Sequence, residues 1–207
     1  EDGFPGNLKI AVRYTLTDDN TFRMDYRVSS DADTIVNLTN HSYFNLNGDP
    51  SKEGTNMVLY VNADNFTPAD DTYMTTGEIK PVEGTPMDFR KPHAISETIN
   101  DTTYQQIKNA TGYDHNWCLN TYKNGKGDDT KVCASLYSPV TGILLEMFTN
   151  EPGVQVYTGN FQGTGIACKH GVKYPKHVSV CLESQKYPDS PNKKDWPSPV
   201  SYTHLRA

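Results

Sequence analysis

A period-two alternation of apolar and polar residues dominates this chain, and a pattern of that kind permits little besides β-structure. Residues 8–16 alternate, the turn formers Asp18-Asp19-Asn20 follow, and residues 22–28 alternate again. Turn residues between two alternating runs are typical of a β-hairpin. The sequence therefore predicts a hairpin near its beginning.

Further strand-like runs follow at intervals along the chain. They occupy residues 34–38, 56–62, 115–120, 131–137, 143–148, 154–158 and 178–183. A turn pattern at residues 138–142 separates two of them, and only residues 94–100, which follow Pro92, have a mildly helical pattern. The sequence predicts an all-β protein, an antiparallel β-sandwich in one domain.

The length and net charge of the chain limit the kinds of partner that we expect for it. The 207 residues suffice for one domain with a core, the formal net charge is −6, and no basic face for nucleic acid is evident in the sequence. The longest apolar runs are far too short to span a membrane. We expect a monomer without membrane or nucleic-acid partners. We expect it in the cytoplasm, and because the chain begins at Glu1 without Met, the periplasm or secretion stays open.

Cysteines and paired acids give no metal pattern. Four Cys residues occur, at 118, 133, 168 and 181, and none has Cys-x-x-Cys or zinc-type spacing. We predict reduced thiols, mostly buried. The pairs Asp70-Asp71 and Asp128-Asp129 are interpreted as solvated turns, so no metal site is expected.

Glu183 is the only carboxylate in a short apolar run, and a Pro-Asp-x-Pro-Asn turn follows it at residues 188–192. Strand alternation puts Glu183 on one face with Cys181 and Gln185. An acid held beside an amide and a rigid turn suits a general base, whose proton transfer depends first on geometry. A solvated Glu on an edge strand is the alternative.

Three other segments combine strand pattern with polar side chains. His41 lies among Asn residues and Tyr43 in residues 37–48, either as a functional group or as a hydrogen-bonded structural His. Asp114 offers acceptors for two sugar hydroxyls, or forms an Asx turn. Gln155 shares a strand face with Tyr157, and its amide can both donate to and accept from a sugar diol.

Together these segments resemble the aldose 1-epimerase family. The matching words are residues 40–46 (NHSYFNL), 112–116 (GYDHN), 157–161 (YTGNF) and 182–185 (LESQ), with a further similarity at residues 84–89 (GTPMDF). They occur in the family's order, and the resemblance covers about residues 3–199.

The resemblance implies a large antiparallel β-sandwich with a sugar cleft on one face. It implies interconversion of the α and β anomers of free aldoses, above all galactose and glucose, with no cofactor. In this sequence it makes Glu183 the catalytic base and His41 the catalytic acid. Tyr43, Asp114 and Gln155 would contact the sugar, and Ser42 lies in the same binding motif.

The ends of the chain depart from the family pattern. Residues 3–8 resemble the middle of a full-length epimerase, so we expect a chain truncated at both ends, without an upstream Asn-Arg pair and a further His that the family supplies to the site. Residues 200–207 resemble a translated sequencing adapter. We therefore predict a partial epimerase domain over residues 1–199 and a non-native tail, and exclude His204 as a ligand.

Three other functions remain open. A non-catalytic carbohydrate-binding sandwich would need Asp114, Gln155 and Tyr43 but no acid and base. A glycoside hydrolase usually needs two carboxylates, which Asp114 and Glu183 could supply, leaving His41 without a role. A sugar-phosphate epimerase would need a cationic clamp, and the four matching words contain no basic residue apart from His.

Overall fold

A computed structural model describes residues 3–201 and 204–206. The chain forms two compact units, one of Glu1–Leu38 with Ser190–Ala207 and one of Thr39–Asp189. These two units do not test the predicted bounds of the domain, residues 1–199, which stay a prediction. Among the described residues, no helix has the length and apolar character needed to cross a membrane.

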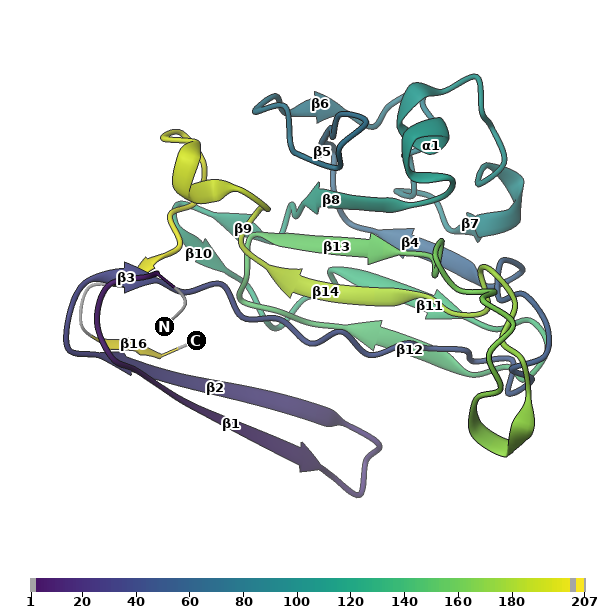
Figure 1. The fold of residues 1–207 in the computed structure, drawn as a ribbon, viewed down its shortest axis with the longest axis horizontal. Helices are drawn as coiled ribbons and strands as arrows, with labels where there is room; N and C mark the ends of the chain where they lie inside the picture. Colours follow the sequence, from purple (N-terminus) through teal and green to yellow (C-terminus); the bar gives the residue numbers. More distant parts are fainter. Residues whose placement is uncertain (1–2, 202–203, 207) are drawn as a thin grey trace. The chain divides into compact units, whose positions relative to one another are not determined.

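The first unit contains the predicted hairpin. Strand β1 (Leu8–Leu16) pairs antiparallel with β2 (Phe22–Ser30) along its whole length, so the hairpin prediction is confirmed (Figure 1). β16 (His204–Arg206) pairs with β2, and β15 (Val200–Ser201) pairs with β3 (Thr34–Ile35). A 3-10 turn, η3, spans Ser190–Asn192. The predicted strand over residues 34–38 thus forms only at its first two residues.

The second unit holds two larger antiparallel sheets. The four-stranded sheet has the order β12 (Leu144–Met147), β11 (Ala134–Tyr137), β4 (Val58–Val61) and β7 (His93–Ala94). The five-stranded sheet has the order β14 (Cys181–Gln185), β13 (Gly153–Tyr157), β8 (Asp114–Cys118), β5 (Asn65–Thr67) and β6 (Lys80–Pro81). Figure 1 shows β8, β13 and β14 lying in this order.

One hydrophobic core joins the two sheets of this unit. Leu59 and Leu136 of the four-stranded sheet and Trp117 and Val156 of the five-stranded sheet are fully buried in a single cluster. Because strand side chains alternate, the other face of the five-stranded sheet is left for polar side chains. The predicted antiparallel β-sandwich is confirmed, and its polar face is where a site can form.

Several short elements differ from the sequence prediction. The mildly helical run forms only a 3-10 turn, η1 (Ile95–Glu97), whereas a true helix, α1 (Gln105–Ala110), was not predicted. A second hairpin, β9 (Tyr122–Lys123) with β10 (Lys126–Gly127), was also not predicted. A further 3-10 turn, η2 (Lys169–Gly171), lies between β13 and β14.

The cysteines are unpaired, as predicted. Cys133 and Cys181 are buried, Cys118 is half-buried and Cys168 is exposed. The first residues of both acidic pairs close their own turns: Asp70 accepts hydrogen bonds from Thr72, and Asp128 from Thr130.

Gly112 leads into β8, and its backbone has a φ of +144°, which a side chain rarely tolerates. An added Cβ would lie 2.4 Å from Asn160 Oδ1 and 2.9 Å from Thr158 Oγ1. We expect Gly112→Ala to lower the free energy of unfolding by about 1–3 kcal/mol, measured by denaturant titration. Gly142 is the matched control, because its φ is +75° but nothing lies within 4 Å of an added Cβ. Equal losses for the two variants would show that crowding at Gly112 contributes nothing.

Candidate active site

A pocket of about 490 Å³ lies on the polar face of the five-stranded sheet. Its lining residues are His41, Tyr43, Asp114, Gln155, Tyr157, Phe161, Glu183, Gln185 and Pro188. Five of the six residues singled out in the sequence are therefore brought together, although they come from distant parts of the chain. The volume falls in the range of small-molecule sites.

The register of β8, β13 and β14 explains why their polar side chains lie side by side in the pocket. Gln155 of β13 lies opposite Glu183 of β14, and Tyr157 lies opposite Asp114 of β8. Because every second residue points to the same face, Glu183 and Gln185 project together, as the sequence predicted. His115 points to the other face, where it is 2% exposed and packs edge-on against Phe66.

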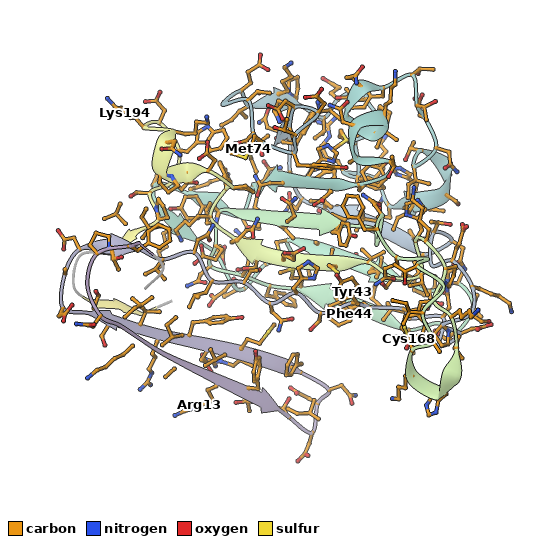
Figure 2. The ribbon with its side chains drawn as sticks, in the orientation of Figure 1. Arg13, Tyr43, Phe44, Met74, Cys168 and Lys194 are labelled. Atoms are coloured by element: carbon orange, nitrogen blue, oxygen red, sulfur yellow. The ribbon has the colours of Figure 1, made fainter. Side chains whose placement is uncertain are left out.

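His41 and Tyr43 reach the pocket because their segment pairs with the chain next to β14. Phe44 and Val180 form an isolated antiparallel bridge, with both N–H···O distances 2.9 Å. Figure 2 labels Tyr43 and Phe44 on this segment. The rings of His41 and Tyr43 are 4.9 Å apart, and His41 lies 5.9 Å from the ring of Tyr157. A β-bridge between distant segments thus holds His41 and Tyr43 at the pocket.

Glu183 is buried even though it belongs to an edge strand. Its exposed fraction is only 7%, so the solvated-Glu interpretation is wrong. Burial raises the pKa of Glu183, the nearby Asp114 carboxylate raises it further, and His41 opposes both effects. His41 Nε2 lies 3.5 Å from Glu183 Oε1, and the His41 side chain is 47% exposed.

Asp114 and Gln155 form a hydrogen-bonded pair beside these groups. Gln155 Nε2 donates to Asp114 Oδ1 over 2.8 Å. Burial raises the pKa of Asp114, while this hydrogen bond and His41 lower it. The other amide atom, Gln155 Oε1, is buried and accepts no hydrogen bond from the residues that the structure describes. Buried acceptors are rarely left without a donor, so this oxygen is suited to a ligand hydroxyl.

Ser42 differs from the other predicted site residues because it does not line the pocket. Its backbone N–H and its hydroxyl both donate to Asn40 Oδ1, at 3.2 and 2.6 Å. These bonds shape the segment that presents His41 and Tyr43. A direct contact of Ser42 with a sugar stays a prediction.

Sequence reasoning did not select four of the lining residues. Tyr157 and Gln185 were placed on the correct strand faces but assigned no role, although alternation was the signal that would have added them. Phe161 and Pro188 lie in turns that follow β13 and β14, where no periodicity indicates which way a side chain points.

Among the described residues, one group has the composition of a metal site. His41, Cys181 and Glu183 each place a ligand atom within 4.8 Å of the others. Cys181 lies on β14 two residues before Glu183 and is fully buried.

The arrangement is suited to proton transfer on a small polar molecule. It has a buried carboxylate, an imidazole and a second carboxylate with an amide, and its described lining contains neither Lys nor Arg. Two groups that can hold different protonation states a few ångströms apart form an acid–base pair.

Comparison with known proteins identifies the class. The sequence model of the family named aldose 1-epimerase matches residues 1–202, and the chain belongs to this family. It is 41% identical to the galactose mutarotase of Homo sapiens over 198 residues, which are 95% of this chain and 54% of that protein. It is 40% identical to the aldose 1-epimerase of Escherichia coli K12 over 200 residues, 96% of this chain and 55% of that protein.

Solved structures give the same result for the fold. An aldose epimerase homologue from C. elegans superposes with a TM-score of 0.83 at 28% identity, covering 99% of this chain and 59% of that one. A galactose 1-epimerase from Lactobacillus acidophilus gives 0.79 at 28% identity, covering 98% and 56%. The chain thus spans about half the length of the curated relatives it matches.

Proposed function

We propose that this protein is an aldose 1-epimerase that interconverts the α and β anomers of free aldoses such as galactose and glucose. The observation that supports this most directly is the separation of 3.5 Å between His41 Nε2 and Glu183 Oε1 at the pocket. The two oxygens that exchange protons during mutarotation are bonded to the same carbon, C1. An acid and a base that serve them must therefore lie only a few ångströms apart.

The proposed reaction opens and recloses a hemiacetal. Glu183, ionised, takes the proton of the C1 hydroxyl, while protonated His41 gives a proton to the ring oxygen, and the bond between C1 and that oxygen breaks. The aldehyde rotates about C1–C2, and the ring closes on the other face with the two proton transfers reversed. Nothing is oxidised or reduced, so the residues of the pocket suffice without a cofactor. Each positioned proton transfer is worth about 10²–10⁴-fold in rate.

Asp114, Gln155 and Tyr43 position the sugar in this proposal. The Asp114 carboxylate accepts hydrogen bonds from sugar hydroxyls, and the buried Gln155 Oε1 accepts one more. Tyr43 is half exposed beside His41, and its ring offers a surface for the C–H face of the sugar.

The electrostatics of the pocket weigh against phosphorylated sugars. Two carboxylates line it, Asp114 and Glu183, and its described lining contains no Lys or Arg to clamp a phosphate. A simple binding module would have no use for a buried carboxylate held against an imidazole, because burying such a group is costly. These observations favour a free monosaccharide as substrate.

Polarimetry tests the function directly. Freshly dissolved α-galactose is followed with the 207-residue chain, and with any longer polypeptide from the same gene that contains it. Acceleration of mutarotation above the buffer rate is the expected result. Tight galactose binding without acceleration by a folded protein would favour the carbohydrate-binding alternative instead.

Gln155→Met keeps the side-chain size but removes both amide functions. We expect KM for galactose to rise about tenfold, because the sugar loses the acceptor Oε1 and Asp114 loses its donor, with a smaller change in kcat. Gln105→Met is the control, because Gln105 is exposed on α1. A fall in kcat with KM unchanged would place Gln155 in the chemical step rather than in sugar binding.

The acid side of the pH–rate profile should report Glu183. Its pKa is raised above the ordinary value of 4.5, and the proposed base must be ionised. The rate should therefore rise with pH through a midpoint above 4.5, not at it, when kcat/KM is measured by polarimetry across the acid range. If kcat/KM stayed constant as the pH was lowered to 4.5, Glu183 would be excluded as the titrating base.

We further propose that the protein acts as a monomer in the cytoplasm. All lining residues of the pocket belong to one compact unit, so a second copy is not needed to complete it. Four unpaired cysteines are typical of a reducing compartment. Sedimentation equilibrium and cell fractionation test the two statements separately.

A further inference from the structure

We propose that His41, Cys181 and Glu183 form an inhibitory binding site for one zinc-type divalent cation, directly on the proposed acid–base pair. This inference rests on the proposed function for its effect on rate. Its binding part stands on the geometry alone, because the three ligand atoms lie within 4.8 Å of one another.

The spacing is close to that of a zinc site. Zinc bonds to N, O and S of about 2.0–2.3 Å in a tetrahedral arrangement place neighbouring ligand atoms roughly 3.3–3.8 Å apart. His41 Nε2 and Glu183 Oε1, at 3.5 Å, already have this separation. Only the distances to the sulfur, which are no longer than 4.8 Å, need to shorten, by roughly 1.3 Å at most.

Two of the three ligands lie on a paired strand, whereas the third lies outside any regular strand. Cys181 and Glu183 occupy same-face positions of β14, paired along its length with β13. His41 lies outside any regular strand, and its side chain is 47% exposed, so it has room to close onto an ion. Three protein ligands leave the fourth position of a tetrahedral zinc ion for water, as in zinc sites that keep water.

The charge around the three groups favours a cation. Two carboxylates, Glu183 and Asp114, line the pocket beside the buried Cys181. When ionised, the two carboxylates repel each other, and the described pocket lining contains no Lys or Arg to offset their charge. A divalent ion relieves this repulsion when it binds, and the thiol releases its proton to solvent.

The ligand set also selects the metal. A thiolate with an imidazole suits zinc and its softer neighbours, whereas Mg²⁺ and Ca²⁺ prefer oxygen ligands alone. Zinc on Glu183 and His41 would remove both proposed proton carriers at once, so the ion acts as an inhibitor that competes with sugar and not as a cofactor.

Binding is tested with Co²⁺, which reports thiolate ligation through a near-ultraviolet charge-transfer band. We expect one equivalent of Co²⁺ to produce the band and Zn²⁺ to abolish it. Cys181→Ser and Cys181→Ala should both lose the band. Cys168→Ser is the matched control, because Cys168 is an exposed thiol on the loop between β13 and β14 (Figure 2). A band that survives both Cys181 variants, or disappears in Cys168→Ser, overturns the site.

Inhibition is tested by polarimetry in metal-free buffer. Zn²⁺ should slow the wild type while Mg²⁺ does not, and galactose should protect. Relative to its own metal-free rate, Cys181→Ser should need at least about tenfold more Zn²⁺ for half-inhibition. Equal zinc sensitivity in the variant overturns the inference while leaving the proposed function intact. If the protein has no mutarotase activity, the Co²⁺ titration alone decides the inference.

Discussion

Replacing Glu183 with Gln is expected to slow mutarotation by about 10²–10⁴-fold, because the proposed base can no longer take the proton of the C1 hydroxyl. Gln has nearly the same shape and can still hydrogen-bond to sugar. The loss should therefore appear in kcat, with KM for galactose changed much less. Polarimetry with freshly dissolved α-galactose measures both constants. Glu146→Gln is the control, because Glu146 is exposed on β12 and does not line the pocket.

The same substitution should stabilise the fold. Folding raises the pKa of Glu183, so its contribution to stability is complete below its unfolded pKa of about 4.5 and is lost as pH rises through the folded pKa. Gln does not ionise, so the variant loses no stability as the pH rises through this range. Tm of Glu183→Gln should exceed that of the wild type at about pH 7.5, and the two should converge near pH 4. A variant that is slower and also less stable at neutral pH would point to a disrupted site rather than to a missing base.

His41→Asn is expected to lower kcat by a similar factor, about 10²–10⁴, because the ring oxygen of the sugar loses its proton donor. His41 also favours the ionised form of Glu183. Its removal should raise the pKa of Glu183 and move the acid side of the pH–rate profile of the residual activity to higher pH. Such a displacement is not expected from a substitution that merely loosens the structure.

His93→Asn serves as the matched control for His41. His93 lies on β7 in the four-stranded sheet, stacks on Phe89 at 4.4 Å and does not line the pocket. If both variants lost activity equally, the effect of His41→Asn would have to be assigned to general destabilisation. A His41→Asn protein with full activity would leave Glu183 to act with a different acid.

The strands could be predicted from the sequence wherever alternation was long. The β1–β2 hairpin and the sharing of a face by Glu183 and Gln185 both follow from period-two pattern. The β9–β10 hairpin is too short to show a period, yet its turn residues Asn124 and Gly125 both have positive φ, of +53° and +78°. That dipeptide is the preferred type I′ turn, and it was the available signal.

The site was only partly predictable, for a physical reason. Family motifs pointed to His41, Glu183 and three other residues that the structure gathers at one pocket. No local pattern reveals that Phe44 pairs with Val180, nor that Gln155 donates to Asp114, because these contacts join segments far apart in the chain. For the same reason the sequence could not separate Ser42, which bonds to Asn40, from its pocket-lining neighbours.

The bridge between Phe44 and Val180 also has a consequence for the order of folding. It brings His41 to Glu183 across most of the second unit, so closing it costs the entropy of a very long loop. Contacts of such high sequence separation tend to form late and slowly. Trp117, buried between the sheets, should therefore reach its native fluorescence during refolding before the acid–base pair is assembled. Recovered catalysis would then report completion of the native state, whereas a folded core alone would not.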